Sequence, residues 1–334
     1  MNTNLSINIG KDEYGKDLTI DLVEAKHLLV AGSTGSGKST LIHRIITTFI
    51  SNNSPEDLRF ILIDPKRVEL TMYDKIPYLL TPTIIDPKQA VLALKHMVKE
   101  MGRRYDTLKK ADCTDISTYQ SDEEFMPRIV IVIDEFSDLM QTYPKEIEPA
   151  VVKLASMGHI VGIHLIVSTS RPSTKVYTKA MQEVFTSRVG LQMGSTADSK
   201  LIVGTDAAVI LRGSGDILFR MGMKYVIRAQ VREIGEHDIK KLVSALVERY
   251  SDIVVPELQT SESDMGEYEN DDMYEPAKEA VIASGKASTA FLQRKLGIGY
   301  SRSAKIIDML EERGVIGPAR GDKPREVIQT KTVH

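Results

Sequence analysis

The chain has 334 residues, of which 42% are hydrophobic and 27% are charged, with a net charge of −3, a composition typical of a soluble globular protein. No stretch of about eighteen uncharged apolar residues occurs, and the first residues do not resemble a signal peptide, so we expect no membrane span and a cytoplasmic location. A single cysteine, Cys113, excludes a scaffold built on internal disulfides.

Residues 1–25 contain two glycines and a stretch of alternating polarity at 18–22. This pattern predicts an N-terminal hairpin or cap that leads into the first strand of the core. No recognisable chemistry is associated with these residues.

Residues 32–39 match the phosphate-binding signature G-x-x-x-x-G-K-[ST] at every specified position. An apolar run of strand length precedes the signature at 27–31, and residues 40–46 follow it with the apolar spacing of a helix. This order places backbone N–H groups and a helix N-terminus against phosphate, with Lys38 on the β- and γ-phosphates of ATP and Ser39 on Mg²⁺. The predicted nucleotide-binding residues are Gly32, Ser33, Thr34, Gly35, Ser36, Gly37, Lys38, Ser39 and Thr40.

A second buried strand and a long helix are predicted next. The strand, at 59–64, ends at Pro65, so its last polar side chains are expected at the ligand edge of a parallel sheet. Asp86 and Pro87 predict the start of a helix whose apolar residues recur every three or four positions up to Leu108. The cations on its other faces fit a solvated surface better than a DNA contact, although both stay open.

Adjacent carboxylates end the apolar run at 129–133. Asp134 suits the acid that holds Mg²⁺ beside a phosphate loop, and Glu135 suits the base that orients or deprotonates the attacking water. A strand ending in two acids is common by chance, but its combination with a phosphate loop favours a hydrolytic site. A fold that only sensed ATP would not need Glu135.

Another buried strand is predicted at 162–169, followed by polar residues at 169–172 that could contact the γ-phosphate or the water. His164 lies inside the apolar run, so we interpret it as a core histidine. Three later strands are expected at 188–193, 216–220 and 224–231. The alternation of strands and helices predicts an α/β sandwich with a mainly parallel sheet over residues 26–251.

An acidic linker is predicted at 252–273, after a last core helix at 237–250. Nine acidic and no basic residues lie between Asp252 and Glu275. Removing these nine negative charges from the net charge of −3 leaves +6 on the rest of the chain. The acidic balance is therefore local and does not exclude a polyanionic partner.

Residues 274–330 predict a separate winged-helix domain, with three helices and two short strands around a basic turn at 318–325. Ser301 is the expected N-cap of the third helix. Nine lysines or arginines against five acids between Lys286 and Glu326 favour a DNA surface, although a protein-interaction role stays open. The predicted DNA-contacting residues are Arg302, Ser303, Lys305, Arg320 and Lys323.

In combination, these motifs resemble the FtsK/SpoIIIE family of double-stranded DNA translocases over nearly the whole chain. The resemblance rests on residues 27–39, Ile63-Asp64-Pro65-Lys66, Arg103-Arg104-Tyr105, VIDEFSDL at 132–139, Gly162-Ile163-His164-Leu165, Arg171-Pro172, Gly215-Asp216-Ile217-Leu218 and LQRKLGIGY at 292–300. It implies a RecA-like P-loop ATPase core that forms a hexameric ring around DNA with ATP between subunits. It also implies a C-terminal winged helix, the γ domain, that recognises short orienting sequences, and a role in chromosome segregation and cell division.

The chain departs from the family pattern at several positions. The membrane-spanning N-terminal part of the family has no counterpart here, which fits a motor-and-γ fragment as well as a phage- or plasmid-type relative. Ser170 stands where the family usually has glutamine, and His159 and Lys200 stand where it commonly has arginine. For the arginine that acts on a neighbouring subunit, the candidates are Arg188 first and Arg171 second.

We therefore expect an ATP-hydrolysing motor that moves double-stranded DNA and whose winged helix orients loading. Lys38, Glu135 and one of the two arginines are its expected catalytic residues. Two alternatives stay open, a DNA-binding regulator in which ATP is only a switch, and a related secretion or packaging ATPase. Acceleration of ATP turnover by DNA would distinguish the motor from the regulator, and the winged helix weighs against secretion.

Overall fold

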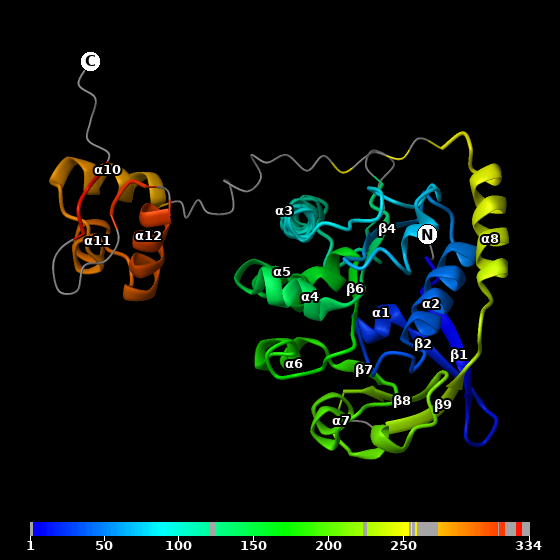
Figure 1. Cartoon of the computed structure of the whole chain (residues 1–334). Helices are drawn as coiled ribbons and strands as arrows, with labels where there is room; N and C mark the ends of the chain where they lie inside the picture. Colours follow the sequence, from blue (N-terminus) through cyan, green and yellow to red (C-terminus); the bar gives the residue numbers. More distant parts are fainter. Residues whose placement is uncertain are drawn as a thin grey trace. The chain divides into compact units, whose positions relative to one another are not determined.

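The structure, a computed structural model, describes residues 3–119, 125–222, 226–253, 255, 258, 273–312, 314–317 and 325–328. The chain divides into two compact units, Met1–Thr260 and Ser261–His334 (Figure 1). Their boundary falls inside the predicted linker. Among the described helices, none has the length and apolar character needed to cross a bilayer.

A nine-stranded sheet organises the first unit, with the strand order β2-β1-β9-β8-β7-β3-β6-β5-β4. The strands are β1 (Ser6–Asp12), β2 (Asp17–Asp21), β3 (Leu28–Ala31), β4 (Leu58–Ile63), β5 (Arg128–Ile133), β6 (Ile163–Thr169), β7 (Ser187–Gly190), β8 (Asp216–Met221) and β9 (Val226–Val231). Strands β7, β3, β6, β5 and β4 are parallel, whereas the remaining neighbours pair antiparallel. The α/β fold with a parallel core is confirmed. The predicted N-terminal hairpin is part of this sheet and not a separate cap.

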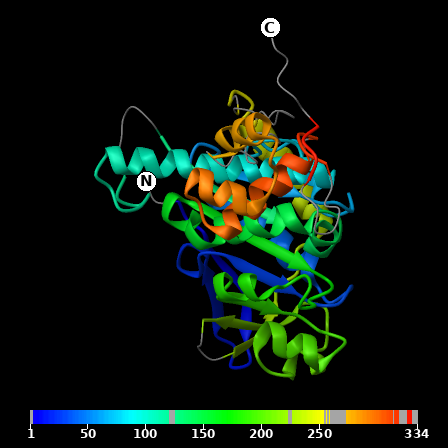
Figure 2. The same cartoon turned by 90° about the vertical axis from the view of Figure 1, so that its left-hand side faces the viewer.

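Helices cover both faces of the sheet (Figure 1). One face carries α3 (Pro87–Lys110), α4 (Phe136–Thr142), α5 (Pro144–Met157) and α6 (Lys179–Val184); the other carries α1 (Leu22–Ala25), α2 (Lys38–Asn52) and α8 (Glu236–Arg249). The short α7 (Thr196–Val203) packs against β7 and β8, and α3 lies beside α5 (Figure 2). Short 3-10 turns are at η1 (Thr71–Tyr73), η2 (Gly158–Val161) and η3 (Ala207–Ile210). Because helices cover both faces, the central strands read as continuous apolar runs; every residue of β4 is buried.

Two helix starts follow directly from local chemistry. The Asp86 carboxylate accepts the Gln89 N–H at 3.0 Å and Pro87 is the first residue of α3, as predicted. Helix α2 begins after Gly37, which has a left-handed φ of 104°. A Cβ at Gly37 would lie 2.5 Å from the backbone nitrogen of Gly215, so only glycine fits this close approach.

The second unit has three helices, α10 (Tyr274–Ser284), α11 (Thr289–Leu296) and α12 (Tyr300–Glu312), around its own apolar core. The Ser288 side chain caps α11 by accepting the Phe291 N–H, as predicted. Isolated bridges join Ala287 to Arg325 and Ile316 to Val327, consistent with the short strands of a winged helix. The prediction of Ser301 as a cap is wrong: α12 starts at Tyr300, and Ser301 is already helical.

Candidate functional site

The candidate site lies at the carboxyl ends of the neighbouring parallel strands β3, β6, β5 and β4. Ala31 is opposite Thr169, and Ile133 is opposite both Val167 and Ile63. The polar residues that follow these strands therefore meet at one edge of the sheet, where open α/β folds bind their ligands.

The phosphate loop after β3 is held in place by backbone hydrogen bonds to two segments that are distant in the sequence. The Ser33 N–H donates to the Gln192 carbonyl at 2.8 Å, and the Gly215 N–H donates to the Ser36 carbonyl at 3.0 Å. Residues 213–215 form a turn directly before β8. The structure shows that this turn packs directly against the loop and helps to fix its backbone.

Two side chains of the loop fit a phosphate ligand. The Lys38 ammonium donates to the carbonyls of Gly32 (2.8 Å) and Ser33 (3.1 Å), and burial lowers the pKa of Lys38 while the nearby Glu135 opposes that shift. The Ser36 hydroxyl is buried and has no hydrogen-bond partner. Phosphate oxygens would accept hydrogen bonds from both groups, and their negative charge would stabilise the buried ammonium.

Asp134 lies directly after β5 and is buried, and its carboxylate accepts a 2.5 Å hydrogen bond from the Ser168 hydroxyl. Burial raises the pKa of Asp134, and the neighbouring carboxylates of Asp64 and Glu135 raise it further. A divalent cation would offset that repulsion, and Ser39, in the first turn of α2, would supply a second oxygen ligand. The described residues contain no cluster of three or more His, Cys, Asp or Glu suited to a metal ion, so phosphate and water oxygens would complete the shell.

Glu135 is enclosed by four hydrogen-bond donors. One carboxylate oxygen, Oε1, accepts from the Ser137 hydroxyl (2.6 Å) and the Ser170 N–H (3.0 Å), and Oε2 accepts from the Ser170 hydroxyl (2.7 Å) and the Lys66 ammonium (2.8 Å). Burial alone would raise the pKa of Glu135, but these donors lower it to about 2. The carboxylate is therefore held firmly in its charged form.

The backbone at Glu135 is also unusual. It has φ 48° and ψ 57°, a left-handed conformation that costs a non-glycine residue on the order of 1–3 kcal/mol. The residue occupies the N-cap position of α4 without capping it by its side chain. This sharp turn instead directs the carboxylate to Ser170 and Lys66.

The loop that carries Lys66 is ordered by Asp64. This fully buried carboxylate accepts the N–H groups of Lys66, Val68, Glu69 and Leu70. Asp64 therefore shapes the turn after β4, and the Lys66 side chain leaves that turn toward Glu135.

The two candidate arginines lie in different surroundings. Arg188 donates to the carbonyls of Phe185 (2.8 Å), Gln182 (2.7 Å) and Ile202 (3.4 Å), and its guanidinium lies 5.2 Å from the ring centre of Tyr177. To act on a neighbouring subunit, Arg188 would have to give up these contacts. Arg171 follows β6 and is exposed at the same sheet edge as the phosphate loop.

The structure describes the side chain of only one of the predicted DNA-contacting residues, Ser303. Ser303 is fully buried and its hydroxyl donates to the Gly299 carbonyl at 3.0 Å, so the expectation that it faces a DNA groove is wrong. Helix α12 packs its Ser303 side inward together with Ile306 and Leu310. Arg302 and Lys305 lie on α12 with undescribed side chains, and Arg320 and Lys323 lie outside the described residues.

His164 is a core residue, as predicted. It is fully buried, its Nδ1 lies 2.8 Å from the Lys26 carbonyl and its Nε2 lies 3.1 Å from Arg128 Nη1. These contacts are at the amino ends of β5 and β6, at the opposite edge from the phosphate loop.

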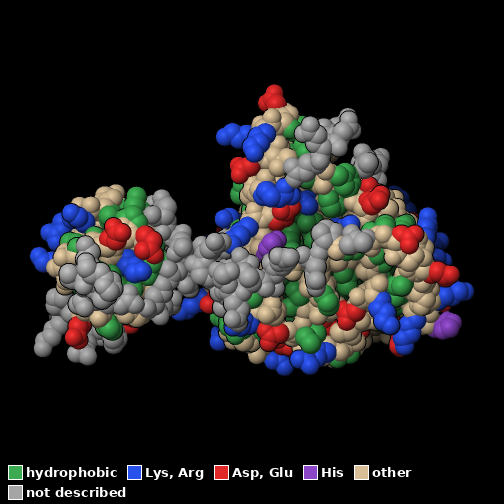
Figure 3. Space-filling model, turned by 90° about the horizontal axis from the view of Figure 1, so that it is seen from above, with side chains coloured by type: hydrophobic (Ala, Val, Ile, Leu, Met, Phe, Trp, Pro, Cys, Tyr) green, Lys and Arg blue, Asp and Glu red, His purple; other side chains and the backbone are tan. Residues whose placement is uncertain are grey.

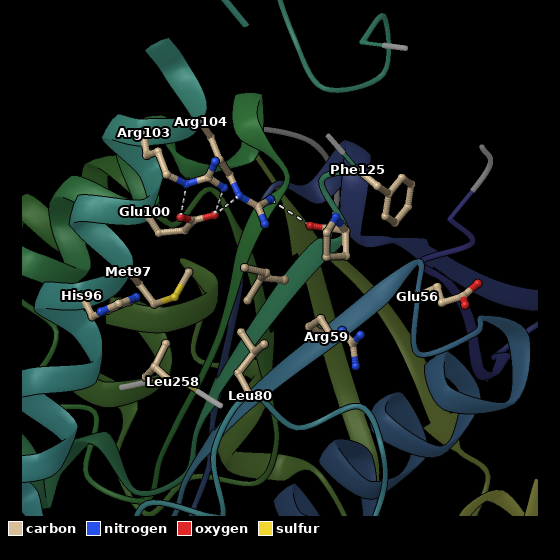
Figure 4. A pocket seen from close by; sticks show the side chains of 12 residues that line it. Glu56, Arg59, Leu80, His96, Met97, Glu100, Arg103, Arg104, Phe125 and Leu258 are labelled. Atoms are coloured by element: carbon tan, nitrogen blue, oxygen red, sulfur yellow. Dashed lines mark hydrogen bonds and ion pairs between the residues drawn. The ribbon is translucent and has the colours of Figure 1, made fainter. Parts of the chain in front are cut away.

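A cavity of about 520 Å³ lies between α3 and the start of β4 and β5 (Figure 4). Arg59 and Ile129 line it near the amino ends of those strands, so it is remote from the phosphate loop. Among its charged residues, Glu100 pairs with Arg103 and Arg104. The candidate nucleotide site is therefore defined by the loop and the carboxylates and not by this cavity.

Basic and acidic side chains are interspersed over the face of the first unit that is seen in Figure 3.

A model of the FtsK/SpoIIIE family matches residues 2–125 and 117–174, and a model of the Ftsk gamma domain matches residues 268–330. The chain belongs to the FtsK/SpoIIIE family. The resemblance inferred from the motifs is thereby confirmed for both ends of the chain.

Relatives of this family match almost the whole chain. DNA translocase FtsK of Caldanaerobacter subterraneus subsp. tengcongensis is 42% identical over 97% of this chain and 46% of its own length. DNA translocase FtsK of Treponema pallidum is 38% identical over 98% of this chain and 43% of its own length. The chain therefore spans less than half the length of these relatives.

Solved structures support the fold. EssC (ATPases 2 and 3) of Geobacillus thermodenitrificans has a TM-score of 0.69 at 20% identity, covering 76% of this chain and 51% of its own. The pCW3 conjugation coupling protein TcpA, solved with ATPγS, has a TM-score of 0.64 at 23% identity over 73% of this chain and 71% of its own. Both share the P-loop ATPase fold of the first unit.

Sequence reasoning did not assign Lys66, Ser137 or Ser170 to the environment of Glu135. Lys66 and Ser170 were visible only as parts of motifs, the stretch after β4 and the stretch after β6. Their position beyond the ends of buried strands is the signal that could have placed them near the site.

Proposed function

We propose that this chain is the motor and DNA-binding part of a double-stranded DNA translocase, driven by ATP hydrolysis. The observation that carries the proposal is the meeting of a phosphate loop and the Glu135 carboxylate at one sheet edge, in a chain that also has a γ domain. The names of the 42% and 38% identical relatives support the same assignment.

In this proposal the chain's own residues divide the work of hydrolysis. Lys38 turns from the Gly32 and Ser33 carbonyls onto the β- and γ-phosphates, and the loop N–H groups hold the phosphate oxygens. Glu135 accepts a proton from the attacking water. Ser39 and Asp134 would hold Mg²⁺, which when bound neutralises phosphate charge.

The partners in this proposal are duplex DNA and further copies of the chain. Family membership supports a hexameric ring, in which Arg171 or Arg188 reaches the phosphates of an adjacent subunit. The γ domain would recognise orienting sequences through Arg302 and Lys305 on α12, together with Arg320 and Lys323 of the basic stretch at 318–325.

The test is ATP turnover with and without long duplex DNA, followed by displacement of a third strand annealed to that duplex. A translocase should show both strong DNA stimulation and strand displacement. DNA binding that depends on ATP, without displacement and without stimulated turnover, would instead identify a DNA-binding regulator.

A further inference from the structure

The four donors around Glu135 leave no free position for the attacking water. A carboxylate offers about four acceptor positions, two on each oxygen. In this structure Oε1 is taken by Ser137 and Ser170, and Oε2 by Ser170 and Lys66. A water molecule can reach a carboxylate lone pair only after at least one donor has left.

The four donors differ in how easily they can leave. Ser137 is fully buried and lies only two residues from Glu135. The Ser170 N–H is fixed by the backbone directly after β6. Lys66 is different because its side chain is 47% exposed, while that of Glu135 is 6% exposed. Lys66 can therefore leave with less rearrangement than Ser137 or the Ser170 N–H.

The turn after β4 lets the Lys66 side chain move alone. Its backbone N–H is held by the Asp64 carboxylate at 3.1 Å, as are the N–H groups of Val68 and Glu69. The backbone can thus stay in place while the four-carbon side chain rotates into solvent.

We propose that Lys66 is a latch on Glu135: together with Ser170 it holds the carboxylate in a resting arrangement, and turnover begins only when the ammonium leaves Oε2. Lys66 and Ser170 are positioning residues in this scheme, because they act through Glu135. The latch keeps ATP turnover low in the absence of DNA. The inference rests on the proposed role of Glu135 as the base.

The test compares ATP turnover of the full chain with and without duplex DNA in several variants. Lys66→Met removes the ammonium and should raise the DNA-free rate about tenfold, since removing one hydrogen bond to a charged group shifts an equilibrium by at least that factor. The DNA-stimulated rate should change little, so the stimulation ratio falls. Lys66→Arg keeps a donor and should retain the wild-type ratio.

Two further variants control for general effects on the loop. Arg67→Met removes the exposed neighbouring cation and should leave both rates unchanged. Ser170→Ala removes one hydroxyl donor but keeps the N–H, so a smaller rise in the DNA-free rate is expected. A Lys66→Met protein that melts like the wild type but shows an unchanged or lower DNA-free rate would overturn the latch.

Glu135→Gln separates failure of the latch from failure of the base assignment. If this variant keeps wild-type turnover, Glu135 is not the base and the proposed mechanism fails. If it loses turnover while Lys66→Met does not raise the DNA-free rate, only the latch fails.

Discussion

At the carboxyl ends of β5 and β6 a buried carboxylate is kept charged, whereas at the amino ends of β3 and β6 buried histidines are kept neutral. Four donors lower the pKa of Glu135 to about 2. Burial lowers the pKa of His27 well below its usual value and that of His164 to about 3. The same sheet therefore holds a charged carboxylate at one edge and neutral histidines at the other.

The difference in charge follows from the groups that surround each side chain. Loops after the strands supply hydroxyl, ammonium and N–H donors to Glu135. At the amino edge, His27 accepts the Leu165 N–H on Nδ1, and its buried Nε2 has no partner. For His164, burial and the nearby Arg128 outweigh the Lys26 carbonyl and Asp21, which would favour a positive charge. For His27, burial and the nearby His164 and Lys26 likewise disfavour a positive charge. Changes at the first edge should therefore alter chemistry, and changes at the second should alter stability.

The largest effect is expected at the carboxyl edge. Glu135→Gln should bind ATP but lower kcat by about 10⁴-fold, because the amide cannot accept the proton of the attacking water. Lys38→Ala should instead weaken ATP binding, because it deletes the cation on the phosphates. Nucleotide titration and steady-state turnover separate the two phenotypes, and Glu135→Gln turnover within a few-fold of wild type would require another base.

The second prediction compares the two candidate arginines. Arg171→Ala should lower kcat by about 10³-fold with ATP affinity retained if Arg171 serves a neighbouring subunit. Arg188→Ala should mainly lower the melting temperature, because Arg188 holds the Phe185 and Gln182 carbonyls.

Mixing the arginine variants with Lys38→Ala protein tests the role in trans. Partial recovery of turnover in a mixture identifies the arginine that acts across the interface. Recovery with Arg188→Ala protein and none with Arg171→Ala protein would assign the role in trans to Arg188.

The third prediction concerns acid stability of the amino edge. An unfolded histidine binds a proton near pH 6.5, but folded His164 stays neutral to about pH 3, so the unfolded state binds more protons between these values. The free energy of unfolding should therefore fall as pH drops below about 6.5, by about 1.4 kcal/mol per pH unit for each such histidine.

Denaturant unfolding between pH 7.5 and 5.5 measures that slope. His164→Gln should flatten it, whereas His237→Gln, at an exposed position on α8, should not. Equal slopes in the wild type and His164→Gln would show that the buried histidine does not control the pH response.

The smallest effect on turnover is expected from removal of the second unit. A chain ending at residue 260 should keep duplex-stimulated ATP turnover and lose any preference for DNA sequence. Arg302→Ala should cost about 1–3 kcal/mol at one base position if it reads a base, or weaken all duplexes with a shallower salt dependence if it contacts phosphate. A second unit without DNA affinity at low salt would contradict both roles.

The sequence alone determined the features that are continuous along the chain. The phosphate loop, the acids after an apolar strand, the Asp86 cap and the three C-terminal helices each depend on neighbours a few residues apart, so local patterns specify them. Ser303 shows the limit of that reasoning. The sequence predicts it as a DNA-contacting residue, but only packing shows that its hydroxyl is buried beside Ile306 and Leu310.

Only the tertiary structure decided what surrounds Glu135. Lys66 is 69 residues away from it and Ser170 is 35 residues away, and they meet because β4, β5 and β6 are parallel neighbours in register. The antiparallel addition of β8, β9 and β1 likewise brings the turn at 213–215 against the phosphate loop. Strand order and register depend on the burial of whole apolar faces, and no local pattern encodes which distant loop ends beside which.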